Sequence, residues 1–196
     1  MKIGIYCGVD VGQVKDKNIS YIGVDHGITH LLKQHICPII GIGDMDSIED
    51  RQLLEGLAID EVSSIKDDTD TALALSYAIS NGYDEIDLYG VTQKRMDHFL
   101  AVLCLLEKYQ DYHITIYDQQ NKIQVLKPGY HKIYKDDYYY FSLFAFDKSD
   151  ISLKECHYPL NHYLLQRNDP LCVSNQMNQD YAIIENDAPL LLIQSN

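Results

Sequence analysis

The sequence predicts an α/β N-terminal domain with a mostly parallel sheet, followed by a small all-β, sandwich-like C-terminal domain. Short β-branched runs alternate with helical patterns over residues 2–117, which is the rhythm of a parallel α/β sheet. After Asp118 helical periodicity disappears, and turn-like stretches such as QQNK, KPGYHK and YKDDYY separate short alternating segments. We therefore expect an α/β domain of residues 1–120 and a β-rich domain of residues 121–196.

The individual elements follow from local patterns. Candidate strands of the first domain cover residues 2–7, 20–24, 37–42, 85–89 and 113–117. Candidate helices cover residues 48–57, 69–79 and 96–109; the second has Ala72, Leu75 and Ile79 on one stripe and stops at Asn81-Gly82. The third is apolar over most of its surface, which predicts a buried helix. Segments 138–146, 151–153, 181–185 and 190–194 are the expected strands of the second domain.

Composition excludes several classes of protein. Sixteen basic and twenty-nine acidic residues give a net charge of −13, which repels nucleic acid and anionic membranes, and no basic run offsets it. The five cysteines are scattered without the paired spacing of a zinc site, so we expect reduced, packed thiols. The opening MKIGIYCG is too short for a signal sequence or a bilayer span, which indicates a cytoplasmic protein.

The segment GIGDMDS, residues 41–47, follows the apolar run CPII. Loops at the carboxyl ends of parallel strands are where open α/β sheets bind ligands. Asp44 and Asp46 can direct two carboxylates at one cation, and hard oxygen ligands suit Mg²⁺. The alternative is an acidic turn in which Asp46 or Ser47 only caps the following helix.

The segment KDDTD, residues 66–70, opens the helix expected at residues 69–79. Lys66 and a helix N-terminus suit phosphate oxygens, whereas Asp67, Asp68 and Asp70 would repel them unless a bridging Mg²⁺ reconciles both sets of groups. Acidic residues in a first turn also simply complement the helix dipole. Three aspartates exceed what a cap requires, so the segment predicts a metal-bound polyphosphate.

The segment GVTQKRMDHF, residues 90–99, forms another strand-to-helix junction. Arg95 could clamp phosphate bidentately, and Asp97 and His98 open an otherwise apolar helix. In the alternative interpretation Arg95 is only a partner of Asp97. We interpret His98 as a satisfied polar residue at a helix end.

Together, GDMDS, KDDTD and RMDH resemble, in order and spacing, the signature segments of thiamine pyrophosphokinases. Downstream, YFSLFAF, LKECHYPL and VSNQ resemble the β-rich thiamine-binding domain of that family, so the resemblance covers nearly the whole chain. It implies an enzyme that transfers a pyrophosphoryl group directly from ATP to the hydroxyl of thiamine with the help of Mg²⁺, giving thiamine diphosphate and AMP.

The resemblance also implies roles for individual residues. Mg²⁺ and the triphosphate would be bound by Asp44, Asp46 and Asp70, which with Arg95 and Asp97 form the expected catalytic set. The residues implied to bind ATP are Asp25, Lys66, Asp67, Thr69 and Arg95. Those implied to face thiamine are Asp97, Ser174 and Asn175, although without the resemblance the last two would be a simple turn. Members of the family are homodimers whose sites draw on both subunits.

The sequence departs from the family pattern at two places. Gln93 and Lys94 stand where two glycines usually precede the arginine, and His26 stands where glycine is common. Two alternatives therefore stay open. One is a related diphosphokinase acting on another heterocyclic alcohol, such as a pterin, although such an enzyme would not need a thiamine-binding half. The other is a non-catalytic sensor of thiamine or nucleotide, although a sensor would not need three carboxylate motifs.

Overall fold

The computed structural model describes residues 1–45, 48, 55–61, 68–93 and 95–196. By its internal contacts the chain divides into two compact units. The first contains Met1–Lys108 and Tyr112–Gln119, and the second contains Tyr109–Asp111 and Gln120–Asn196.

The first unit is built on a parallel sheet. Its described strands are β1 (Lys2–Tyr6), β2 (Ser20–Val24), β3 (Ile40–Gly43), β4 (Ile59–Glu61), β5 (Glu85–Tyr89) and β6 (His113–Tyr117). They lie in the order β6-β5-β1-β2-β3-β4, and each neighbouring pair is parallel. The predicted strands are thus confirmed within a few residues at their ends, whereas β4 was not predicted.

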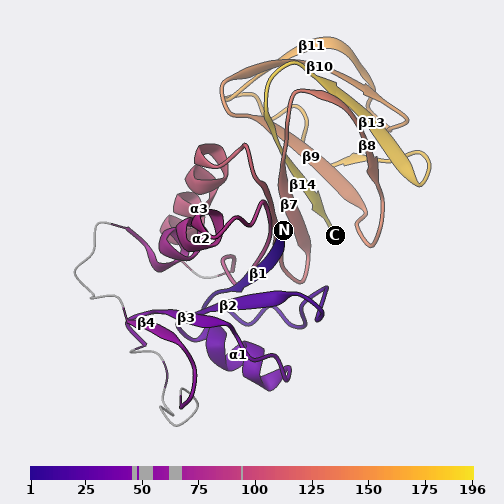
Figure 1. The fold of residues 1–196 in the computed structure, drawn as a ribbon. Helices are drawn as coiled ribbons and strands as arrows, with labels where there is room; N and C mark the ends of the chain where they lie inside the picture. Colours follow the sequence, from indigo (N-terminus) through magenta and orange to yellow (C-terminus); the bar gives the residue numbers. More distant parts are fainter. Residues whose placement is uncertain (46–47, 49–54, 62–67, 94) are drawn as a thin grey trace. The chain divides into compact units, whose positions relative to one another are not determined.

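Helices cover both faces of this sheet (Figure 1). Helix α1 (Gly27–Lys33) packs on one face, and α2 (Asp70–Ser80) and α3 (Met96–Lys108) lie on the other. On the α1 face Leu31 packs against the buried rings of Tyr6, Tyr21 and Tyr89. Helix α1 was not predicted, while the predicted second and third helices are confirmed.

Two expectations about helices need correction. Helix α3 is not buried over most of its surface: Val102 and Leu106 are buried, but Met96 is 67% and Leu100 57% exposed. The helix predicted at residues 48–57 lies mostly outside the described residues. At its end, residues 55–57 form a turn and a bend rather than a helix.

The second unit is a sandwich of two antiparallel sheets. One has the order β12-β9-β14-β7 and the other β11-β10-β13-β8. The strands are β7 (Asn121–Leu126), β8 (Gly129–Tyr134), β9 (Tyr140–Ala145), β10 (Lys148–Lys154), β11 (Leu160–Gln166), β12 (Asn175–Gln176), β13 (Tyr181–Asn186) and β14 (Leu190–Ser195). A single cluster of buried side chains from both sheets, including Leu143, Ile151, Leu165 and Leu192, forms the core, as the alternating pattern predicts.

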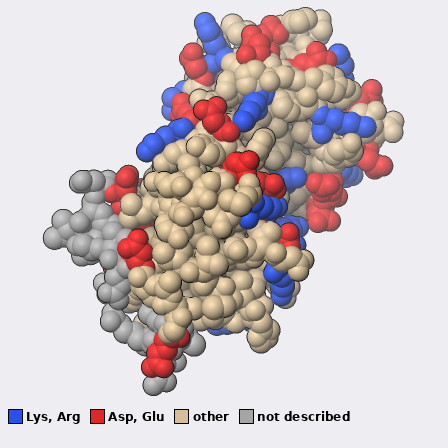
Figure 2. Space-filling view, in the orientation of Figure 1, with Lys and Arg blue, Asp and Glu red and all other residues tan. Residues whose placement is uncertain are grey.

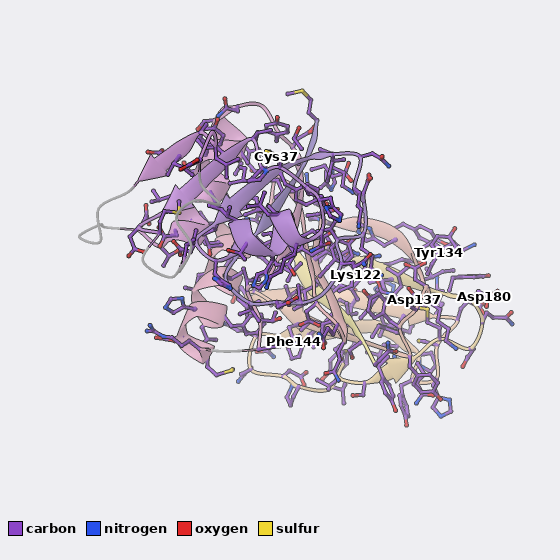
Figure 3. All side chains as sticks on the ribbon, turned by 90° about the horizontal axis from the view of Figure 1, so that it is seen from below. Cys37, Lys122, Tyr134, Asp137, Phe144 and Asp180 are labelled. Carbon is purple, nitrogen blue, oxygen red and sulfur yellow. The ribbon has the colours of Figure 1, made fainter. Side chains whose placement is uncertain are left out.

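The stretches expected as breaks in this unit partly form strands. KPGYHK contains the start of β8, and QQNK contains the start of β7. At one end of the sandwich Tyr134, Asp137 and Asp180 lie together (Figure 3). There the backbone N–H of Lys135 donates to the carbonyl of Asp180 at 2.9 Å, and Tyr134 pairs with Tyr181. Strand β8 is therefore fixed by pairing with β13, a partner distant in the chain that the turn-like composition around β8 does not predict.

The surface charges and the cysteines test the remaining expectations from composition. On the face drawn in Figure 2, Lys and Arg residues lie among Asp and Glu residues rather than forming a continuous basic area. No helix in the described ranges is long and apolar enough to cross a membrane. All five cysteines are free; Cys7, Cys156 and Cys172 are buried, but Cys37 and Cys104 are exposed, so the expectation of packed thiols is wrong for these two.

Candidate functional site

The strand order of the first unit reverses between β1 and β5. The chain runs from β1 outward through β2, β3 and β4, then returns to the other side of β1 with β5 and β6. Ligands of open α/β sheets bind outside the carboxyl ends of the strands at such a switch point. A cavity of about 590 Å³ lies there, lined by residues that follow β1, β2 and β5 and by the starts of α2 and α3: Cys7, Gly8, Val9, Val24, Asp25, His26, Thr69, Asp70, Thr71, Gly90, Val91, Thr92, Arg95, His98 and Val102.

A close backbone approach joins the loops after β1 and β5. The N–H of Cys7 donates to the carbonyl of Tyr89 at 2.8 Å, and that of Val9 to the carbonyl of Gly90 at 3.2 Å. Gly90 has a φ of +73°, and a Cβ there would lie 2.6 Å from the carbonyl oxygens of both Cys7 and Val9. Only glycine fits at this position, which holds the two loops together at the floor of the cavity.

Helix α2 presents its N-terminus to the cavity. Thr69 is the N-cap, and its Oγ1 accepts the N–H of Ala72 at 3.2 Å. Asp70 lies in the first turn, and the Oγ1 of Thr71 is 3.6 Å from the Sγ of Cys7. The N–H groups in the first turn of this eleven-residue helix point out of its N-terminus, which favours an anion there. Burial raises the pKa of the Cys7 thiol to about 12, so Cys7 is not a nucleophile at neutral pH.

Arg95 and Asp97 form a bidentate pair at the start of α3. The Nε of Arg95 lies 3.1 Å from Oδ1 of Asp97, and a terminal guanidinium nitrogen lies 2.6 Å from Oδ2. The hydrogen bond from Arg95 lowers the pKa of Asp97 to about 2. The alternative interpretation of this motif, Arg95 as partner of Asp97, therefore describes the observed contact. Because Arg95 also lines the cavity and both side chains are largely exposed, the guanidinium can exchange this carboxylate for a phosphate.

Asp25 brings a carboxylate to the end of β2. Its φ is +49°, and its N–H donates to the carbonyl of Ile42 at 3.1 Å. A Cβ at Gly43, which has a φ of +138°, would collide with Oδ1 of Asp25. The carboxylate therefore lies against the residue that precedes Asp44, which links the ends of β2 and β3.

The structure brings together four residues that the family resemblance assigns to ATP, metal or catalysis: Asp25, Thr69, Asp70 and Arg95 all line the cavity. Asp44 follows β3, is half-buried and does not line it. Asp46, Lys66 and Asp67 lie outside the described residues. Within the part of the chain that is described, no three His, Cys, Asp or Glu side chains are grouped to hold a metal ion. The donor chemistry nevertheless fits Mg²⁺, because the loops supply carboxylates.

Some residues that line the cavity were not predicted from the sequence. By local pattern, residues 7–9 are only the end of an apolar strand. They line the cavity because β5 lies beside β1, which no local pattern specifies. Thr92 is 7% exposed, and no described group hydrogen-bonds to its Oγ1. A buried hydroxyl without a partner costs free energy, which a hydrogen bond to a ligand or a shift of the loop could offset. Next to it, Gln93 keeps a left-handed φ of +72°, although a side chain replaces the usual glycine there; Lys94 lies outside the described residues.

In the second unit, Ser174 and Asn175 have different surroundings. Ser174 is exposed with a φ of +59°, and its N–H donates to Oγ of Ser142 at 3.0 Å. Asn175 is 3% exposed, and its amide bonds the backbone of Tyr158 and Gln176. The hydroxyl of Ser174 can face a ligand, whereas the amide of Asn175 serves the local fold.

Comparisons with known proteins agree with this arrangement. The family described as thiamin pyrophosphokinase, catalytic domain, matches residues 11–117, and the thiamin pyrophosphokinase vitamin B1 binding domain matches residues 130–191. The thiamine pyrophosphokinase of Bacillus subtilis (strain 168) is 36% identical over 177 residues, which cover 86% of this chain and 83% of that protein.

Solved structures extend the likeness to the whole fold. The crystal structure of thiamine pyrophosphokinase from Bacillus subtilis matches with a TM-score of 0.90 at 31% identity, covering 100% of this chain and 99% of that one. That of thiamin pyrophosphokinase from Geobacillus thermodenitrificans matches with a TM-score of 0.88 at 28% identity, covering 100% and 98%. The chain therefore belongs to the thiamine pyrophosphokinase family.

Proposed function

We propose that this chain transfers the terminal pyrophosphoryl group of ATP to the hydroxyl of thiamine, giving thiamine diphosphate and AMP. The observation that carries the proposal is the cavity at the β1/β5 switch point, where the N-terminus of α2, Arg95 and the carboxylates of Asp25 and Asp70 meet. Cationic and N–H donor groups suit a polyphosphate, and carboxylates suit the metal ion that accompanies it.

On the nucleotide side, we assign residues 1–120 to ATP and metal binding. Thr69 orders the first turn of α2 through its capping bond, which aims the turn's N–H groups at the cavity. Arg95 neutralises charge on the transferred group, and Asp25, Lys66 and Asp67 complete the proposed ATP-binding set. Such positioning and charge neutralisation supply most of the catalysis in phosphoryl-type transfers.

Asp44, Asp46 and Asp70 would hold Mg²⁺, which when bound supplies positive charge against the phosphate oxygens. Among the described residues, the chain places Asp44 directly after β3 and Asp70 in the first turn of α2. These carboxylates would repel the phosphates unless the cation lies between them. No covalent enzyme intermediate is needed, and the raised pKa of Cys7 argues against the thiol that lines the cavity as a nucleophile. Direct attack by the thiamine hydroxyl is the simplest route.

On the thiamine side, we assign residues 121–196 to binding the vitamin. Ser174 offers an exposed hydroxyl, and Asn175 shapes the loop beside it. Asp97 is proposed to face thiamine when Arg95 turns to phosphate, because its carboxylate then becomes available to a cationic ring.

The experiment is product analysis with purified protein, Mg²⁺, ATP and thiamine. We expect thiamine diphosphate and AMP in equal amounts, because the attack is at the β-phosphorus. ADP with thiamine monophosphate would reject the route. Binding of thiamine without either product pair would favour a sensor, and turnover of a pterin alcohol in place of thiamine would favour the related diphosphokinase.

We further propose a cytoplasmic homodimer in which each active site is completed by the second subunit. Exposed Met96 and Leu100 on α3 support an association surface. Sedimentation equilibrium gives the mass, and mixing Asp70→Asn with Ser174→Arg tests sharing. If the two residues serve one site from different chains, mixed dimers keep one intact site, and activity should recover to about a quarter of wild type. No recovery despite proven subunit exchange would remove the shared-site proposal.

A further inference from the structure

His26 lies in the wall of the ATP cavity at a position where the family usually has glycine. It follows Asp25 at the end of β2 and is the N-cap of α1, with φ −59° and ψ −16°. Within this described helix its side chain makes no capping hydrogen bond, and the half-buried ring lines the cavity together with Thr69 and Arg95. The imidazole is therefore part of a residue that lines the cavity and does not cap the helix.

A second histidine on α1, His30, packs against the ring of His26. His30, one turn further along α1, is 6% exposed, and its ring centroid is 4.8 Å from that of His26 at an interplanar angle of 83°. His30 is itself packed 5.4 Å from the ring of Tyr6, and its Nδ1 is 3.7 Å from Oδ2 of Asp10. Burial lowers the pKa of His30, although Asp10 opposes the shift. An uncharged, packed ring thus fixes His26 without repelling a charge on it.

The charged residues that line the cavity provide few N–H donors for a polyphosphate. Arg95 is the only lysine or arginine among the described residues that line it, and its guanidinium is shared with Asp97. Asp25 and Asp70 contribute negative charge to the same walls. A polyphosphate entering here therefore needs donors besides Arg95, and an imidazole held in the wall is suited to that task.

We propose that His26 donates a ring N–H to a phosphate oxygen of the nucleotide, and so binds its polyphosphate end rather than its nucleoside. The proposal rests on ATP being the substrate. Thiamine is a poor alternative partner, because an N–H donor is not attracted to its cationic thiazolium ring, whereas it complements a phosphate anion.

Calorimetric titration of the full-length protein in Mg²⁺ with three probes tests this assignment: adenosine, ADP and inorganic tripolyphosphate. For His26→Ala we expect the Kd of ADP and of tripolyphosphate to rise about tenfold, as for loss of one hydrogen bond to a charged group, with no change for adenosine. His26→Lys restores a donor and should recover most of the loss. His35→Asn is the matched control, because His35 is exposed near the end of the same helix and has a φ of +61°, which Asn tolerates.

Three outcomes would overturn the proposal. An equal loss of affinity for adenosine and ADP in His26→Ala would place His26 at the nucleoside. Unchanged affinities would show that His26 does not contact the ligand. If the wild-type protein bound neither ADP nor tripolyphosphate, the cavity would not be a polyphosphate site. If His26→Ala does not fold, His26→Gly, which has the residue usual in the family and no donor, carries the same comparison with His26→Lys. The thiamine reaction is assayed separately, so a wild-type protein that binds ADP through His26 but makes no thiamine diphosphate would reject the proposed function and leave this contact standing.

Discussion

The side-chain amide of Asn175 holds both backbone polar groups of Tyr158. Its Oδ1 accepts the N–H of Tyr158 at 3.1 Å, and its Nδ2 donates to the carbonyl of Tyr158 at 2.9 Å. The same Oδ1 also accepts the N–H of Gln176 at 2.9 Å. Tyr158 is 62% exposed, so a buried amide fixes the loop that displays an aromatic ring.

We expect Asn175→Ala to lower the free energy of unfolding by about 1–3 kcal/mol, because it leaves partly buried backbone groups of Tyr158 and Gln176 without partners. Denaturant unfolding measures the loss. Asn178→Ala is the control, since Asn178 makes one described side-chain bond, to the carbonyl of Cys156 at 3.0 Å, and should cost less. Equal costs would contradict the central role of Asn175 in this loop.

Asp70→Asn should lower kcat on the order of 10²–10³-fold, because it removes one charged contributor at the proposed metal and phosphate site. The fold should tolerate the change, since the loss of a first-turn carboxylate costs only about 0.3–1 kcal/mol. Steady-state kinetics at saturating Mg²⁺ measures the effect. Asp68→Asn serves as the control, because Asp68 is exposed and does not line the cavity. Comparable losses in both variants would mean that the acidic segment acts only through its overall charge.

The left-handed backbone of Gln93 gives a prediction about stability. A β-branched residue is strained at a φ of +72°, so Gln93→Val should be less stable than Gln93→Gly by about 1–2 kcal/mol. Thermal unfolding of the two variants measures the difference. If valine and glycine were equivalent, Gln93 would not keep the glycine-type conformation that the family pattern implies.

His30 should make stability depend on pH. Its pKa in the folded protein is below its ordinary value of 6.5, chiefly because of burial, so the unfolded chain takes up a proton more readily than the folded one. The contribution of neutral His30 to the stability of the fold is therefore fully present above about pH 6.5, and it is lost progressively as the pH falls below that value. His30→Phe keeps a ring but cannot titrate, and its melting temperature should fall less than that of wild type between pH 7 and 5.5. Parallel curves would contradict this assignment.

The sequence predicts those helices and strands that are determined by residues within the same segment, and it misses those that depend on packing against distant segments. The β-branched runs of β1, β2, β5 and β6 and the capped stripe of α2 determine those elements by themselves. Helix α1 is short and contains Gly27 and Thr29, so it depends on packing of Ile28 against Gly23 and Gly41. Strands β4, β7 and β8 likewise depend on pairing partners distant in the chain, which are β3, β14 and β13 respectively.

The candidate site divides in the same way. Asp70 and Arg95 could be predicted, because charged residues at strand-to-helix junctions are visible in the sequence, whereas Thr69 was implied only by the family resemblance. The wall formed by residues 7–9 could not, because it requires β5 to lie beside β1, and no local pattern specifies strand order. For the same reason His26 was noticed only as a departure from the family pattern, not as a residue supported by His30.

The tyrosine face of the parallel sheet has an optical consequence. The chain contains sixteen tyrosines and no tryptophan, and Tyr89 stacks between Tyr6 and Tyr117 at centroid distances of 5.6 Å on each side. Its carbonyl also accepts the N–H of Cys7 in the cavity floor. A tryptophan introduced at exposed Met96 or Leu100 would therefore fluoresce without a native indole background, on the helix that contributes His98 to the cavity wall.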